Sequence, residues 1–500
     1  MIKNFKLLFL VSLTFVACSK NDDVTIDANS SDGLPLTSGS ADFSKYVALG
    51  DSFTAGFSDN ALFIEGQKGA YPNILAQQFA LVGGGEFKTP LMADNIGGFV
   101  GSSTYTPRFY FDGTGPAVVP GASSTNPTTI LTGYFNNMGV TGAKCIHLDY
   151  PGYGSSMGNP YFARFASNPM KTIVDDAVEQ TPTFFSLWIG GNDVFGYASS
   201  GGLNDADITP TATFNSAYNG LITKLTAGDR KGVVANLPYV NTLPMFTTVP
   251  TNPIPALPAA QSGPLNQLFS VINQIAAGAN QPSRFVTITT DDNNPATTEA
   301  TNPLLIVDET LVDLSVYIKN ALSPTYGVPL ATYLGNQYGK ARHAKNTSSG
   351  RDFILLTASS LIKPPNNIEA SAQSPFNARG VSYPLQDNLV LTIDEADKIK
   401  TATDAYNVTI STAAANSNLA IFDAKETMRQ ISTTGITANG FTITSGYVTG
   451  GGFSLDGVHP SPRGYALIAN EFIKAINTKY GSNMKGVDLG NYRILFPASL

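Results

Sequence analysis

Two segments near opposite ends of the chain carry side chains that together could perform nucleophilic catalysis. Ser52 follows a short apolar run in Gly50-Asp51-Ser52. A serine hydroxyl is a poor nucleophile at neutral pH and needs a base within hydrogen-bonding reach. Of the three histidines, His459 is the best placed, because Asp456 precedes it by three residues and can orient its ring. We therefore expect Ser52, His459 and Asp456 to form a catalytic triad.

Two further segments offer hydrogen-bond donors for such a reaction. Attack on an ester carbonyl creates an oxyanion, which needs donors aimed at it. The candidates are the backbone N–H groups of Ser52 and Gly142 and the side-chain amide of Asn192. Gly97 or Gly98 is an alternative to Gly142, although both glycines could equally belong to a simple turn.

The remaining polar candidates have simpler structural interpretations. Asp51 and Asp193 lie beside the expected site residues, and we expect them to support the backbone rather than to react. His147 lies in an apolar run, which favours a place in the core or in a wall. His343 lies in a basic, polar segment, which favours a solvated surface. Cys145 is expected to be a small buried side chain.

Short apolar runs that alternate with helical patterns must position these residues. Strands are expected at 46–50, 183–189, 232–237 and 419–423, with a further strand at 351–360. Helices are expected at 72–80, 214–225, 265–277, 392–414 and 461–479. Such alternation predicts an α/β fold with a parallel sheet covered on both sides. Functional residues gather at the carboxyl ends of strands in such sheets, which is where Ser52 and Asn192 fall.

Taken together, the four segments resemble the GDSL, or SGNH, hydrolase superfamily. Its four signature residues correspond to Ser52, Gly142, Asn192 and His459, in the same order along the chain, and Asp456 completes the triad. The resemblance implies a flavodoxin-like three-layer α/β/α fold. It also implies hydrolysis of esters without a metal or another cofactor.

The resemblance does not cover the whole chain. It extends over about 44–240 and 418–480, whereas 241–417 carries no motif of the family. We therefore expect one SGNH hydrolase domain at 43–480 that contains 241–417 as a large insertion, followed by a C-terminal tail at 481–500. We expect the insertion to shape the acyl or alcohol pocket.

The N-terminus resembles that of a bacterial lipoprotein. Residues 1–17 combine two lysines with a short apolar stretch, as in a signal peptide. Phe15-Val-Ala-Cys18 resembles a lipobox, which predicts lipidation of Cys18 and a polar tether at 18–42. The acidic residues after Cys18 resemble the surface-export signal of some Bacteroidetes lipoproteins. We expect anchoring at the outer membrane or cell surface; an ordinary signal peptide with a chance cysteine is the alternative.

Composition narrows the possible partners. Charged residues make up only 13% of the chain, the net charge is −7 and no basic stripe occurs, which argues against nucleic-acid binding. With two cysteines, one of them lipidated, no disulfide framework is expected.

The expected substrate is a lipid, an aryl or alkyl ester, or an acylated glycan. Two alternatives remain: a carbohydrate O-deacetylase with the same mechanism, and a non-catalytic surface lipoprotein that binds a glycan or a partner.

Overall fold

A five-stranded parallel sheet forms the centre of the computed structural model, which describes residues 27–363 and 367–500. All four neighbouring strand pairs are parallel. Across the sheet the strands follow the order β13 (Ala420–Phe422), β6 (Lys231–Ala235), β5 (Phe184–Trp188), β1 (Tyr46–Gly50) and β4 (Asn137–Gly139). The chain passes from β1 to β4 on one side and then crosses to β5 on the other, so the strand order reverses at β1.

The strands are apolar because helices cover both faces of the sheet. Every residue of β1 and β5 is buried, as expected for parallel strands without a solvated face. The strands expected at 46–50, 183–189, 232–237 and 419–423 are confirmed, with ends within two residues. The pattern did not reveal β4, because its three residues at the edge of the sheet are too few to show a period.

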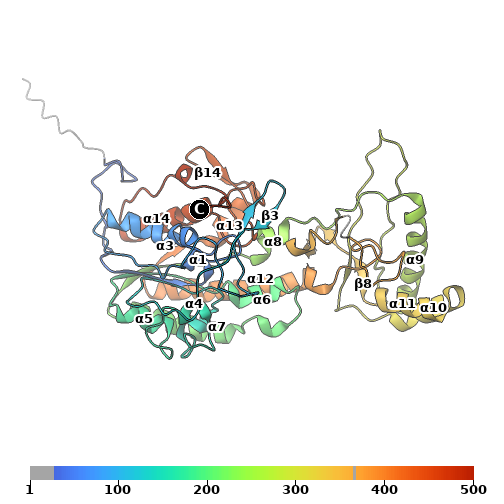
Figure 1. Ribbon diagram of the computed structural model, residues 1–500, viewed down its shortest axis with the longest axis horizontal. Helices are drawn as coiled ribbons and strands as arrows, with labels where there is room; N and C mark the ends of the chain where they lie inside the picture. Colours follow the sequence, from blue (N-terminus) through green and yellow to red (C-terminus); the bar gives the residue numbers. More distant parts are fainter. Residues whose placement is uncertain (1–26, 364–366) are drawn as a thin grey trace, which may run out of the picture.

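Two groups of helices pack on opposite faces of the sheet (Figure 1). One face carries α3 (Tyr71–Ala80) and α14 (Pro462–Tyr480). The other carries α5 (Ile173–Glu179), α6 (Asn192–Ser199), α7 (Thr211–Thr226) and α12 (Ile393–Asn416). This arrangement confirms the expected α/β class with a central parallel sheet.

Local sequence explains where the two long C-terminal helices begin. Ser461 caps α14 by accepting a hydrogen bond from the N–H of Gly464 at 3.0 Å, and Pro462 occupies its first turn. At α12, Thr392 and Glu395 form a capping box. Both helices were expected from the sequence, and for α14 the cap, the proline and the apolar face were the signals.

A second hydrophobic core lies beside the sheet and is built from residues between 249 and 390. Figure 1 shows its helices at the end of the molecule away from α3 and α14. It contains α9 (Ala259–Gly278), α10 (Ser315–Tyr326), α11 (Val328–Tyr338) and the pair β7 (Leu305–Val307) and β8 (Ala341–His343). The region expected as an insertion thus has its own core up to Val390, whereas α12 returns to pack on the sheet.

One strand expectation within this region is wrong. Residues 351–360 do not form a single strand: β10 (Gly350–Arg351), β11 (Phe353–Ile354) and a short 3-10 helix (Leu356–Ala358) divide them. The backbone changes its pairing partner at Asp352, because β10 pairs with β9 (Asn346–Thr347) whereas β11 pairs with β12 (Val390–Leu391), and it enters the 3-10 helix at Leu356. Asp352 itself is fully buried, and its carboxylate accepts two hydrogen bonds from Arg342 at 2.5 and 3.0 Å.

Apart from α13, which has ten residues, the remaining α-helices and strands of the described chain are short. They are α1 (Ser52–Ala55), α2 (Ile64–Lys68), α4 (Pro160–Ala163), α8 (Pro244–Thr247), α13 (Ala424–Thr433), β2 (Phe109–Phe111), β3 (Pro116–Val118), β9 (Asn346–Thr347), β12 (Val390–Leu391), β14 (Ile436–Ala438) and β15 (Phe441–Ile443).

The described N-terminal segment runs along the C-terminal one. The N–H of Ser31 donates to the carbonyl of Asn483 at 2.7 Å, and the N–H of Thr37 donates to the Asn483 side chain at 2.8 Å. Part of the tether expected at 18–42 is therefore hydrogen-bonded to the segment after α14. The expected signal peptide at 1–17 and Cys18 lie outside the described residues. Within 27–363 and 367–500, no helix is both long and apolar enough to cross a membrane.

Candidate active site

Ser52 lies at the junction of β1 and α1, at the carboxyl edge of the sheet. Asp51 caps α1 by accepting a hydrogen bond from the N–H of Phe53 at 3.0 Å. Ser52 is the first helical residue, so its own N–H has no acceptor within the helix. Gly50 ends the strand where a Cβ would lie 2.4 Å from the carbonyl oxygen of Trp188, which leaves no room for a side chain. The serine thus sits where the strand order reverses, the usual place for a ligand in such sheets.

The structure brings together the three residues expected to form a triad. The His459 Nε2 atom lies 2.8 Å from the Ser52 hydroxyl oxygen, and its Nδ1 atom lies 2.9 Å from Asp456 Oδ2. The side chains of His459 and Asp456 are only 14% and 9% exposed. A base within hydrogen-bonding reach of a serine, itself held by a carboxylate, is the arrangement that activates a serine for attack.

The carboxylate of Asp456 is held by four N–H groups. Its Oδ1 accepts from the backbone of Val458 and of His459, both at 2.8 Å. Its Oδ2 accepts from His459 Nδ1 and from the backbone of Asn60 at 3.0 Å. Burial by itself would raise the pKa of Asp456, but the facing His459 and these donors outweigh it and lower the pKa to about 2. Asp456 is therefore ionised at neutral pH and can stabilise a protonated His459.

A tight turn after α1 supplies one of these donors. Ser58 and Ala61 exchange two backbone hydrogen bonds, both at 3.0 Å, around Asp59 and Asn60. The two central residues have φ of +50° and +69°, as in a type I′ turn. Asp and Asn tolerate this left-handed conformation better than most residues do. The turn aims the N–H of Asn60 at Asp456.

Asp59 ties the same turn to the loop that carries the triad acid and base. Its N–H donates to Ser454 Oγ at 3.0 Å, and its Oδ1 accepts from the N–H of Leu455 at 2.9 Å. Burial raises the pKa of Asp59 to about 7, and the nearby charge of Asp456 acts in the same direction. Sequence reasoning missed Asp59 and Asn60; the Asp-Asn pair after a short helix was the available signal.

Gly142 and Asn192 line the same cavity as Ser52 and His459. Gly142 has a φ of +79°, which favours glycine, and a Cβ there would meet nothing within 4 Å. Asn192 begins α6 directly after β5, and its amide donates one hydrogen bond to the carbonyl of Ala143 at 3.0 Å. An amide nitrogen carries two hydrogens, so the second can serve a substrate.

Gly97 and Gly98, the alternative donors, lie outside the cavity of Ser52. A Cβ on Gly97 would approach Ala61 at 2.8 Å, and one on Gly98 would approach the carbonyl of Tyr105 at 2.3 Å. Both have positive φ and serve backbone turns. In the described part of the chain, neither is among the residues that line the cavity of Ser52.

The two neighbouring aspartates support the backbone, as expected. Asp193 is fully buried, and its Oδ2 accepts a hydrogen bond from the N–H of Cys145 at 2.8 Å, which holds the loop that carries Gly142. Burial raises the pKa of Asp193. Burial also raises the pKa of Asp51 to about 7. Cys145 is buried, as expected.

The other two histidines lie apart from the serine. His147 is half-buried, stacks on Tyr153 with 4.5 Å between ring centroids and accepts a hydrogen bond from the N–H of Lys144 at 3.0 Å. This fits the expected wall position. The expectation of a solvated His343 is wrong: it is 4% exposed and accepts a hydrogen bond from the N–H of Val286 at 2.9 Å.

The burial of His343 follows from strand pairing. Its strand, β8, pairs with β7 and places the ring against Phe269 and Phe285 in the second core, with centroids 5.2 and 5.6 Å away. This burial lowers the pKa of His343 to about 4. The basic residues on either side of His343 indicated a solvated surface, so the sequence did not reveal this buried strand of three residues.

The cavity beside Ser52 has a volume of about 290 Å³ and a mostly apolar wall. The wall comes from the carboxyl ends of β5, β6 and β13 and from α13 and α14. Its large apolar residues are Phe53, Trp188, Phe195, Leu237, Val240, Leu243, Phe422, Met428, Ile431, Phe453, Val458, Leu467 and Ile468. Among the described residues of 241–417, Leu243 alone lines it, so this region contributes much less to the pocket wall than expected.

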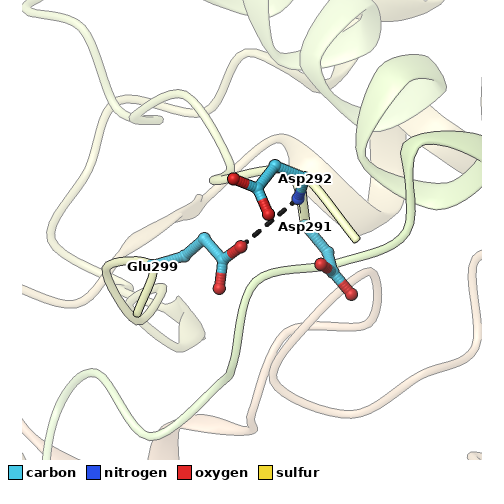
Figure 2. Close-up of side chains that lie close together, drawn as sticks. All are labelled: Asp291, Asp292 and Glu299. Atoms are coloured by element: carbon cyan, nitrogen blue, oxygen red, sulfur yellow. Dashed lines mark hydrogen bonds between the residues drawn. The ribbon is translucent and has the colours of Figure 1, made fainter. Parts of the chain in front are cut away.

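Two groups of carboxylates could attract a cation, but neither touches this cavity. Asp291, Asp292 and Glu299 lie together on an exposed loop (Figure 2), where the N–H of Asp292 donates to Glu299 at 3.3 Å. The second group is Glu309, Asp387 and Glu395. Within the described residues, no member of either group lines the cavity of Ser52, so neither group bears on chemistry there.

A comparison with protein families supports the GDSL/SGNH superfamily and a hydrolase of that kind. The family model described as GDSL-like Lipase/Acylhydrolase matches residues 320–472. The match contains Asp456 and His459 but does not reach Ser52, Gly142 or Asn192. It begins inside the region expected as an insertion. No curated protein and no solved structure matches the chain.

Replacing Asp59 with Asn should change how stability depends on pH. In the folded chain the pKa of Asp59 is about 7, against about 3.9 in an unfolded chain. The folded state therefore keeps a proton that the unfolded state has lost, and Asp59 costs stability as pH rises from about 4 to 7. We expect Asp59→Asn to lose less stability than the wild type over this range, measured as melting temperature at pH 4.5 and 7.5.

The exposed Asp229 provides the matched control for this measurement. Asp229→Asn should follow the wild-type pH dependence. An Asp59→Asn profile that parallels the wild type would show that Asp59 does not hold its proton in the folded chain.

Proposed function

We propose that the protein is a serine hydrolase that cleaves carboxylic esters through an acyl-enzyme intermediate. One observation carries this proposal: the hydrogen-bonded chain from Asp456 through His459 to Ser52, at a cavity that Gly142 and Asn192 also line. The match to GDSL-like lipases and acylhydrolases supports the same reaction class.

The proposed first half-reaction acylates the serine. His459 Nε2 accepts the proton of Ser52 as its Oγ bonds to the ester carbonyl carbon. The resulting oxyanion accepts hydrogen bonds from the N–H groups of Ser52 and Gly142 and from the Asn192 amide. Asp456, which is ionised at neutral pH, stabilises the protonated imidazole ring of His459. His459 then gives the proton to the leaving alcohol as the carbon–oxygen bond breaks.

The second half-reaction frees the serine. His459 accepts a proton from water as the water oxygen attacks the acyl carbon. Collapse of the second tetrahedral intermediate breaks its bond to Ser52 Oγ, which takes back the proton. No step requires a metal or another cofactor.

The arrangement of the sheet supports assignment to the SGNH hydrolase fold. Numbered along the chain, the five strands follow the order 2-1-3-4-5. This is the order of flavodoxin-like doubly wound sheets, whose ligands bind where the order reverses. Ser52 lies at that point, after β1.

Replacing Ser52 with Ala should abolish turnover of p-nitrophenyl esters. Loss of a triad nucleophile costs more than about 10⁴-fold in kcat, because no other group can form the acyl-enzyme. The exposed Ser411→Ala on α12 is the matched control and should retain wild-type turnover. A fluorophosphonate probe, which bonds only to an activated serine, should label the wild type and the control but not Ser52→Ala. Wild-type-like hydrolysis by Ser52→Ala would refute the proposal.

The same probe separates the two remaining alternatives. A non-catalytic surface protein that keeps only the fold would leave the probe unreacted. A carbohydrate O-deacetylase would react with it and would prefer acetylated glycans to alkyl esters.

Replacing Asn192 with Ala should lower kcat by roughly 100- to 1000-fold, because one donor to the oxyanion is lost. KM should change little, since this hydrogen bond strengthens only in the transition state. The exposed Asn219→Ala on α7 is the control. A loss below about threefold would remove Asn192 from the oxyanion hole.

We also propose that a lipid on Cys18 anchors the chain to an outer membrane or cell surface, as in Bacteroidetes-like lipoproteins. The lipobox-like run before Cys18 carries this proposal. Cys18→Ala should move the protein from the membrane fraction to the soluble fraction and should remove incorporation of labelled palmitate. Unchanged palmitate labelling of Cys18→Ala would exclude lipidation at this residue.

A further inference from the structure

We infer that Glu309, Asp387 and Glu395 bind one calcium ion at the junction between the second core and the sheet. In the described structure none of the three lines the cavity of Ser52, so the ion has a structural role and takes no part in the proposed reaction. The position of these side chains, two buried oxygens without a partner and the spacing of the oxygens support this site.

The three carboxylates come from separate segments that meet where the chain leaves the second core. Glu309 follows β7, and Asp387 begins a short 3-10 helix just before β12. Glu395 lies in the first turn of α12, which packs on the sheet. Between Asp387 and Glu395, Val390 belongs to the second core and Leu391 to the main core. An ion bound by all three carboxylates would therefore fasten the second core to the sheet.

A glycine turn after α6 packs against two of these acids. A Cβ on Gly201 would lie 2.2 Å from the carbonyl oxygen of Asp387, and a Cβ on Gly202 would lie 2.2 Å from Glu395 Oε1. The turn therefore has no room for side chains and encloses part of the cluster. Glu309 is exposed, which leaves a path for an ion to enter.

Two carboxylate oxygens of the cluster are buried and have no hydrogen-bond partner in the described chain. Glu395 is only 1% exposed. Its Oε2 accepts hydrogen bonds from the N–H and the hydroxyl of Thr392 at 2.7 and 2.8 Å, whereas its Oε1 accepts none. Asp387 Oδ1 is also buried and accepts none. A buried carboxylate oxygen without a partner is unfavourable, and a bound cation would satisfy it.

In the described part of the chain, no basic side chain forms an ion pair with any of these three acids. Arg342 is paired with Asp308 and Asp352. Lys340 donates a hydrogen bond to the backbone carbonyl of Glu309 at 2.8 Å rather than to its carboxylate. A divalent cation would therefore supply positive charge that the neighbouring side chains do not.

The spacing and the chemistry of the cluster fit calcium. One oxygen from each carboxylate lies within 4.8 Å of the others. Ca²⁺ binds oxygens at roughly 2.4 Å, so two of its ligands can be about 4.8 Å apart, whereas two ligands of Mg²⁺ reach only about 4.2 Å. The cluster offers oxygen ligands alone, without the histidine or cysteine that zinc prefers. Water and backbone carbonyls commonly complete the shell of Ca²⁺.

Thermal unfolding of the full chain tests the site. Calcium sites of extracellular modules have Kd values of roughly 0.1 to 1 mM. With a Kd of about 0.1 mM, about 10 mM CaCl₂ should favour the folded state about 100-fold and raise the Tm by about 3 to 5 °C relative to EDTA at the same ionic strength. MgCl₂ should give less than half of this shift. An equal shift with MgCl₂ would overturn the assignment to calcium.

Two variants of the cluster and one control locate the ion. Asp387→Asn and Glu395→Gln each remove a charge at nearly constant shape, and Gln can still take part in the capping box with Thr392. Each should reduce the calcium-dependent shift in Tm to less than about 1 °C. In EDTA each should melt no lower than the wild type, because a buried charge without a partner is removed. Asp292→Asn, in the exposed group of Figure 2, is the matched control and should keep the full shift.

Protons are the other means of neutralising the cluster. Burial and the facing carboxylate of Glu309 raise the pKa of Asp387 to about 8. If protons alone neutralise these acids, the Tm of the wild type would not respond to CaCl₂, which would overturn the inference.

Equilibrium dialysis with radioactive calcium counts the bound ions directly. Asp387→Asn should bind one ion fewer per chain than the wild type, and Asp292→Asn should bind as many as the wild type. The reverse result would place the ion on the exposed loop and would refute the site at the junction.

Discussion

The site depends on satisfying one buried carboxylate. A carboxylate removed from water is costly unless donors surround it, and Asp456 meets four N–H groups. Two come from the backbone just after it, one from the ring of His459 and one from Asn60. Because Asn60 follows α1 closely, the same hydrogen bonds that satisfy the charge also fix the C-terminal loop beside Ser52. The hydrogen bonds that stabilise the Asp456 carboxylate therefore also bring His459, the proposed base, to Ser52, the proposed nucleophile.

The sheet order explains why Gly142 and Asn192, the proposed oxyanion donors, flank Ser52. In the sheet, β1 lies between β4 and β5. The loop after β4 carries Gly142, and α6 after β5 begins with Asn192. Because all three strands run parallel, their carboxyl ends meet at one edge, and Ser52 lies between the two flanking donors. The loops after β6 and β13, farther along the same edge, contribute to the apolar wall.

The second core occupies most of the region between β6 and β13. It is built from residues 249 to 390, and in the described chain it contributes little to the cavity. The family match begins at residue 320, within this core, and ends inside α14. The returning α12 packs on the sheet, and its residues Ala396, Ile399 and Tyr406 belong to the main core. This helix links the second core to the sheet, and elements that follow it in the chain supply much of the wall of the cavity beside Ser52.

The sequence by itself determined the local features of this protein. The apolar runs of β1, β5, β6 and β13, the caps of α12 and α14, and the Asp456–His459 spacing are all readable from neighbouring residues. Periodicity reports burial and backbone conformation within one element, so long elements are recovered well. It fails for the three-residue strand that buries His343 and for the interrupted segment around Asp352. The helix α13 was likewise not anticipated.

Only the tertiary structure decided which distant residues meet. The Asp59-Asn60 turn contacts a loop almost 400 positions away, and no local pattern records that pairing. The apolar cavity is likewise a property of several strand ends and two helices together. Its wall residues look like ordinary core residues in sequence, because an apolar side chain facing a pocket and one facing the core obey the same local rule of burial. The residue types for the proposed chemistry at Ser52 could therefore be read from the sequence, whereas the space beside the serine could not.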